Sequence, residues 1–261
     1  MLRKGDLTQG GITGTLLHFT LPMLVGSFLQ QCYNIADTLI VGQCIGAGAL
    51  AAVGSAYTLM VFLISVLLGL AMGSGTVFSL HYGAGNHVAL RRSIFSSFAL
   101  IGIVTLILNV VVFIWLDPIL RLLQVPQDIY GMMRSYLWII FCGIVFTFIY
   151  NFYASLLRAV GDSVTPLWFL AVSVVLNIAL DLFFILQLDW GIQGAAAATV
   201  LAQGVAALGI IIYTYRRRPE LRWHHEDMCF DRTCLKEIAS FSTPVSYTHL
   251  RAHETGAYLV C

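Results

Sequence analysis

The sequence predicts an all-α, polytopic membrane protein built as a bundle of six transmembrane helices. Hydrophobic residues make up 59% of the 261 residues, and charged residues only 10%. A soluble domain carries roughly 25% charged residues, and a large core does not explain such a deficit. Six apolar segments are each long enough to cross a bilayer, which takes about 20 residues. The formal net charge of +1 gives no indication of a nucleic-acid partner.

The six expected spans follow one another along the first 215 residues. They are residues 15–40, 51–80, 93–116, 130–156, 164–188 and 192–215. The first span is the least uniform, because it carries proline, amide and carboxyl side chains: Pro22, Gln30, Gln31, Asn34 and Asp37. Polar groups at membrane depth are tolerated where they face a cavity or another helix, so we expect this span to face away from lipid.

The positions of Lys and Arg orient the spans. One side of the membrane would carry eight of them and the other side two. The eight are Arg3, Lys4, Arg91, Arg92, Arg158, Arg216, Arg217 and Arg218, and the two are Arg121 and Arg134. Basic residues favour the cytoplasmic side. We therefore expect a multi-pass protein of the cell's inner (plasma) membrane, with both termini cytoplasmic and lipid as its surroundings.

Polar side chains inside the spans are the candidate functional residues. Asp181 lies in the fifth span, and Asn177 precedes it by one helical turn on the same face. Asp37 lies in the first span and Thr199 in the sixth. A carboxylate in hydrocarbon costs at least about 2.5 kcal/mol on insertion scales and usually marks a pathway or a relay.

The expected depths of these residues agree. With the orientation above, Asp181 lies seven residues before the outer end of its span, and Thr199 seven residues after the outer start of its own. At 1.5 Å per residue both are about 10 Å below the outer boundary. Asp37 also falls near the outer end of its span. The depths favour one shared site, and the alternative is separate polar residues that are each hydrogen-bonded locally.

The side chains suit a coupling ion. Two carboxylates, an amide oxygen and a hydroxyl are the ligands that a hard cation such as Na⁺ prefers. Two nearby carboxylates in a low dielectric also do not both ionise easily, so the same site suits a proton. The choice between Na⁺ and H⁺ stays open. We expect no other cofactor or metal and no enzyme, because no nucleophile, base and oxyanion-hole arrangement is visible.

Four stretches resemble the multidrug and toxic compound extrusion (MATE) family. They are YNIADTLIVG at residues 33–42, LRAVGDSVTP at 157–166, LNIALD at 176–181 and GIQGAAAAT at 191–199. Their order and spacing fit the family over about residues 8–245. Members have two six-helix lobes around a central cavity and export cationic and amphipathic compounds, driven by inward Na⁺ or protons.

The resemblance implies a function for this chain as the first lobe of a twelve-helix transporter. The implied cation site is Asp37, Asn177, Asp181 and Thr199. Gln30, Tyr33 and Asn151 are candidates to line the substrate cavity, with helix packing as an equal alternative. The implied partners are small cationic or amphipathic substrates and a missing C-terminal lobe.

The last 46 residues differ from the rest. Residues 235–244 parallel residues 16–22, with an aromatic, small polar residues and a proline in the same order. We therefore expect a six-helix lobe at 1–215, and a cytoplasmic linker with the start of a second, parallel repeat at 216–245. Residues 246–261 interrupt the expected seventh span with charge and histidine, and we interpret them as a non-native tail on a truncated chain. A genuine short cytoplasmic end is the alternative.

Two other functions compete with drug efflux. A lipid-linked oligosaccharide flippase of related architecture would show arginines in its cavity for a pyrophosphate group, and no arginine lies mid-span here. A non-transporting membrane subunit, such as a sensor, would have no shared cation site. Independent behaviour of the two carboxylates would favour that subunit.

Overall fold

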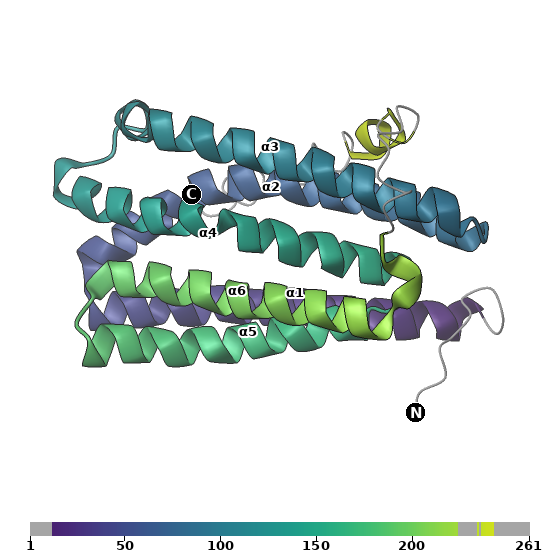
Figure 1. The fold of residues 1–261 in the computed structure, drawn as a ribbon. Coiled ribbons are helices and arrows are strands. Elements are labelled where there is room, and N and C mark those ends of the chain that lie inside the picture. The colour runs from purple at the N-terminus through teal and green to yellow at the C-terminus, as the bar shows by residue number, and fades with distance from the viewer. Residues whose placement is uncertain (1–11, 224–233, 235, 243–261) are drawn as a thin grey trace.

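The computed structural model describes residues 12–223, 234 and 236–242, and it shows a bundle of long helices (Figure 1). The elements, in chain order, are α1 (Ile12–Cys44), α2 (Ala47–Gly83), α3 (His87–Leu122), α4 (Gln127–Ala159), α5 (Val164–Leu182), the π-helix η1 (Phe183–Gln187), α6 (Gly191–Arg217) and the short 3₁₀ turn η2 (Pro219–Leu221). Each of the six predicted spans corresponds to one long helix, with η1 continuing α5. The all-α prediction is confirmed.

Short connections make consecutive helices run in opposite directions, so α4 and α6 run the same way. The α4–α5 turn needs a left-handed backbone, which Gly161 supplies with φ of 84° and no steric penalty. Helix α4 lies at the centre of the bundle and packs against α6, α2 and α3. Helix α5 packs against α6 and α1, and α1 also contacts α6.

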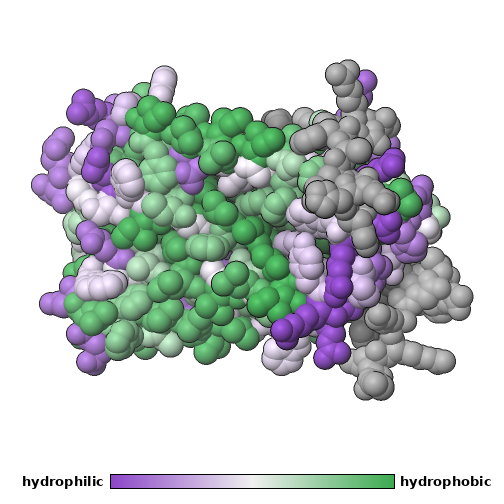
Figure 2. Space-filling view, in the orientation of Figure 1, coloured by the Kyte–Doolittle hydropathy of each residue, from purple (hydrophilic) through white to green (hydrophobic). Residues whose placement is uncertain are grey.

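The surface is apolar between two polar ends (Figure 2). In the described part of the chain, five helices are long and apolar enough to cross a membrane: α2, α3, α4, α5 with η1, and α6. Helix α1 is 33 residues long and packs beside α5, but its amides and Asp37 make it less apolar. An aromatic cluster packs between α2, α3 and α4, and it contains Phe78, Phe98, Phe148 and Phe152.

The close approach of α4 and α6 depends on Gly143. A Cβ at this position would collide with the side chain of Val200, so the two helix backbones meet where α4 has no side chain. Small residues at helix contacts let membrane helices pack closely. Because Val200 directly follows Thr199, this contact fixes the depth and rotation of the hydroxyl that reaches the site described below.

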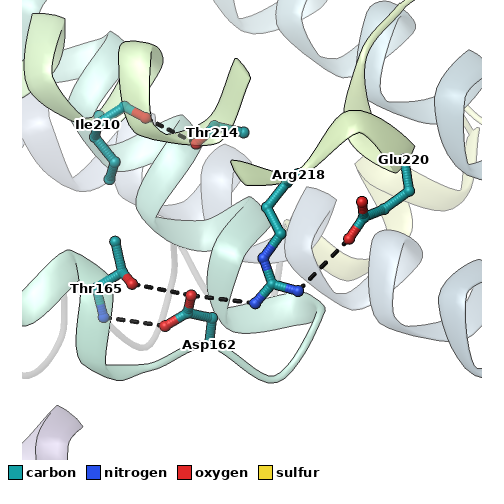
Figure 3. A network of polar contacts seen from close by, with 6 residues as sticks. All are labelled: Asp162, Thr165, Ile210, Thr214, Arg218 and Glu220. Carbon is teal, nitrogen blue, oxygen red and sulfur yellow. Dashed lines mark hydrogen bonds and ion pairs between the residues drawn. The ribbon is translucent and has the colours of Figure 1, made fainter. Parts of the chain in front are cut away.

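The predicted cytoplasmic end is closed by a polar network (Figure 3). The Asp162 carboxylate accepts hydrogen bonds from the Thr165 backbone N–H at 3.0 Å and the Thr165 hydroxyl at 2.9 Å, which holds the first turn of α5. Arg218 Nη2 lies 3.2 Å from Asp162 Oδ2, and Arg218 Nη1 lies 3.5 Å from Glu220 Oε1. Burial lowers the pKa of the Arg218 guanidinium, but its hydrogen bond to Asp162 and the two acidic charges outweigh this effect, so its pKa is raised. This network ties the segment after α6 to the start of α5.

Candidate cation site

The structure brings together the four residues that the sequence predicts as the cation site. Asp37 comes from α1, Asn177 and Asp181 from α5, and Thr199 from α6. Their exposed fractions are 8%, 1%, 0% and 7%, in that order. The carboxyl groups of Asp37 and Asp181 lie within electrostatic range of each other. The spacing of four residues on α5 places the amide and the carboxyl on one face, as the sequence predicts.

Asn177 connects the Asp181 carboxylate to Thr199. In one amide orientation its Nδ2 donates to Thr199 Oγ1 at 3.3 Å. In the reverse orientation its Nδ2 donates to Asp181 Oδ2 at 3.0 Å, and its Oδ1 accepts from the Thr199 backbone N–H at 3.2 Å. The reverse orientation pairs each donor with an acceptor, so it is the more stable orientation of the amide. In it, the amide stabilises Asp181 in its charged form.

The site contains buried oxygens with no protein partner. Among the residues that the structure describes, neither Asp37 Oδ1 nor Asp181 Oδ1 has a hydrogen-bond partner. An unpaired polar atom away from water costs about 1–3 kcal/mol, and more when it is charged. A bound proton or a hard cation would remove this cost, and the oxygen-rich set of side chains fits either one.

Two tyrosines border the site. The Tyr33 hydroxyl lies 3.3 Å from Thr199 Oγ1, so the structure places this residue at the cation cluster, whereas the sequence suggested the substrate cavity or helix packing. The phenol of Tyr136 on α4 is buried and within electrostatic range of Asp37, Tyr33 and Asp181. Sequence reasoning missed Tyr136, and the available signal was only a phenol hydroxyl within a predicted span.

The other two cavity candidates lie apart from these contacts. Gln30 is exposed on α1. Asn151 is half-buried on α4, where its amide donates to the Thr147 carbonyl at 2.8 Å. Their role in binding a substrate stays a prediction.

Comparison with known proteins identifies the family. The family model MatE matches residues 22–183, a stretch that contains Asp37, Asn177 and Asp181. The chain belongs to the MatE family. It is 35% identical over 217 residues to the "Probable multidrug resistance protein YpnP" of Bacillus subtilis (strain 168), an alignment that covers 83% of this chain and 49% of that protein. It is 31% identical to the "Multidrug export protein MepA" of Staphylococcus saprophyticus, over 77% of this chain and 45% of that protein.

Solved MATE structures share the fold. An outward-facing "multidrug resistance MATE family transporter of the MOP superfamily" matches 96% of this chain and 55% of its own, with a TM-score of 0.88 and 25% sequence identity. A "MATE in complex with MaD3S" matches 96% and 56% with the same score and identity. The chain therefore spans about half the length of the relatives that it matches, and this part has the fold of a MATE transporter.

Proposed function

We propose that this chain is the first lobe of a cation-coupled antiporter that exports cationic or amphipathic compounds across the plasma membrane. The observation that carries this proposal is the convergence of two buried carboxylates, each with an unpaired oxygen, in a chain of the MatE family. Relatives named as multidrug export proteins support export of drugs as the function.

Asp37 and Asp181 bind the coupling ion, Na⁺ or H⁺, in this proposal. Asn177 and Thr199 complete the oxygen-rich shell, and Tyr33 fixes the Thr199 hydroxyl from the α1 side. Antiport requires that ion and drug favour different states of the lobe, because a ligand shifts a conformational equilibrium only by its difference in affinity for the two states. The site meets one condition for antiport. Its proposed ligands come from α1, α5 and α6, so their arrangement changes if these helices move.

The predicted orientation, with both termini cytoplasmic, belongs to the same proposal. It places the Asp162–Arg218 network on the cytoplasmic side and the cation site in the outer half of the bilayer. The flippase alternative requires basic side chains in the cavity. In the described residues the arginines lie near helix ends, and Arg134 is paired with Asp117 at 2.8 Å.

The test uses drug efflux by a complete transporter that contains this lobe. Asp181→Asn and Asp37→Asn should each abolish efflux at normal expression, and the double variant should be no worse, because groups that act as a unit are not additive. Asp189→Asn is the matched control. Asp189 is exposed in the α5–α6 turn with φ of 55°, a conformation that asparagine also adopts readily. Full efflux by Asp181→Asn would reject the site, and additive partial losses would indicate two separate polar positions.

A further inference from the structure

Polar side chains continue from the cation cluster along the contact between α4 and α6. Gln203 lies one helical turn after Thr199 on α6. The Thr147 hydroxyl, on α4, donates a hydrogen bond to Gln203 Oε1. The Thr147 carbonyl accepts from Asn151, one turn further along α4. Because α4 and α6 run in the same direction, this row leads from Thr199 toward the end of the bundle that holds Asp162 and Arg218 (Figure 1).

A small cavity lies within this row. Its volume is about 20 Å³, and its polar lining is Thr147, Thr199 and Gln203, with apolar side chains of α2, α4 and α6 around them. A cavity needs roughly 10–15 Å³ to hold one water molecule, and the water needs two to four polar partners. Size and lining both meet these conditions, whereas an all-apolar cavity of the same size would stay dry.

The hydrogen-bonding capacity of the lining also fits one water molecule. The Thr199 hydroxyl donates to the Ala195 carbonyl at 3.1 Å, so its oxygen keeps acceptor capacity. The Thr147 hydroxyl donates to Gln203 and likewise keeps an acceptor, and the Gln203 amide keeps its N–H donors. A water molecule between them would donate to both threonine oxygens and accept from Gln203.

We propose that this cavity binds one water molecule, and that Thr147 and Gln203 are positioning residues that act through it on Thr199. The water site itself is independent of the function proposed above. Only its consequence rests on that function: a fixed Thr199 hydroxyl contributes to the affinity of the coupling ion. Without the water, the Thr199 hydroxyl loses one hydrogen-bond partner, and the site becomes less well ordered.

Water in the cavity is measurable by brief X-ray radiolysis of the full chain in lipid nanodiscs with H₂¹⁸O, because ¹⁸O enters side chains next to bound water. Phe141 lines the cavity and is 1% exposed. Phe152 lies on the same helix, is 0% exposed and packs in the aromatic cluster, so it is the control residue. Phe141 should be labelled severalfold faster than Phe152. Equal labelling of the two would overturn the water site.

Substitutions test what holds the water. Thr147→Val keeps the shape of the side chain but removes the hydroxyl, and it should reduce Phe141 labelling to the Phe152 level. Thr147→Ser keeps the hydroxyl and should retain the labelling, which also controls for folding. Labelling of Thr147→Val at the wild-type rate would show that the lining does not hold the water, and the proposal would fail.

The positioning role is tested separately in a complete transporter. Gln203→Leu should raise the ion concentration for half-maximal efflux severalfold, with a smaller effect on the maximal rate. If Gln203→Leu loses the Phe141 labelling but leaves the ion concentration for half-maximal efflux unchanged, the positioning role is overturned. Failure of the function proposed above would appear differently, as full efflux by Asp181→Asn with Phe141 labelling intact.

Discussion

Stabilisation of the folded chain by its coupling ion is the most direct prediction from the site. If Na⁺ binds between Asp37 and Asp181, adding it at 100 times its dissociation constant should stabilise the chain by about 2.7 kcal/mol. At about 2–4 °C per kcal/mol, this corresponds to a rise of roughly 5–10 °C in the melting temperature. The shift is measured by thermal unfolding of the purified 261-residue chain, once in Na⁺ and once in a large organic cation at the same concentration.

Asp181→Asn should remove this stabilisation without unfolding the chain. A unit charge about 4 Å from a cation contributes about 4 kcal/mol at an effective dielectric constant of 20, more than the whole expected ion effect. The fold should tolerate the change, because the new amide keeps an oxygen for the Asn177 donor and gains an N–H that can reach Asp37. Loss of a buried charge also relieves its desolvation cost, so the melting temperature without Na⁺ should not fall.

The outcomes distinguish a site for Na⁺, a site for a proton, and no shared ion site. Asp189→Asn, the exposed control, should keep the full response to Na⁺. A proton as coupling ion predicts no response to Na⁺ but stabilisation on acidification that Asp181→Asn lacks, because a proton shared by the two buried carboxylates removes their repulsion. If Asp181→Asn responds to both ions as the wild-type chain does, the reasoning about the site is refuted.

Three further predictions concern the rest of the lobe. In a background without exposed cysteines, an impermeant thiol reagent added outside cells should label Trp190→Cys and not Val88→Cys; labelling at residue 88 would overturn the orientation. Arg218→Met should lower the free energy of unfolding, measured by denaturant melts, by about 1–3 kcal/mol, because the Asp162 carboxylate then loses its ion pair while it stays shielded from water. Arg217→Met, at an exposed position, should change the free energy of unfolding little. Cells that express only these 261 residues should show no dye efflux, since alternating access needs two bodies that rock about a site, and efflux at the level of a full-length relative would contradict this.

The helices and the clustering of the polar side chains could be predicted from sequence for physical reasons. Spans are set by the length of apolar runs, and depth follows from counting residues along a helix of known rise. These two rules favoured one shared position for Asp37, Asp181 and Thr199 over separate polar residues. The one-turn spacing supplied Asn177.

The remaining features depend on how the helices are rotated about their axes, which this sequence does not reveal. In a soluble helix the polar face marks the outside, but here lipid-facing and core-facing sides are both apolar, so the pattern carries little information on rotation. Tyr136 and the Thr147–Gln203 pair therefore could not be assigned to a site before the packing of α4 was known. The π-helix η1, which begins two residues after Asp181, has no cue in the letters FFILQ.

We expect ion binding and transport to be separable in this chain. The described ligands of the site come from α1, α5 and α6, which pack together through α5. Their closeness to one another rests on contacts within the lobe, such as Gly143 against Val200 and the pairing of Asp162 with Arg218. Substrate export, by contrast, needs a cavity closed by a second body. The lobe alone should therefore bind its ion with full dependence on Asp37 and Asp181 while it moves no drug. The proposed ion site could thus be measured without the complication of transport.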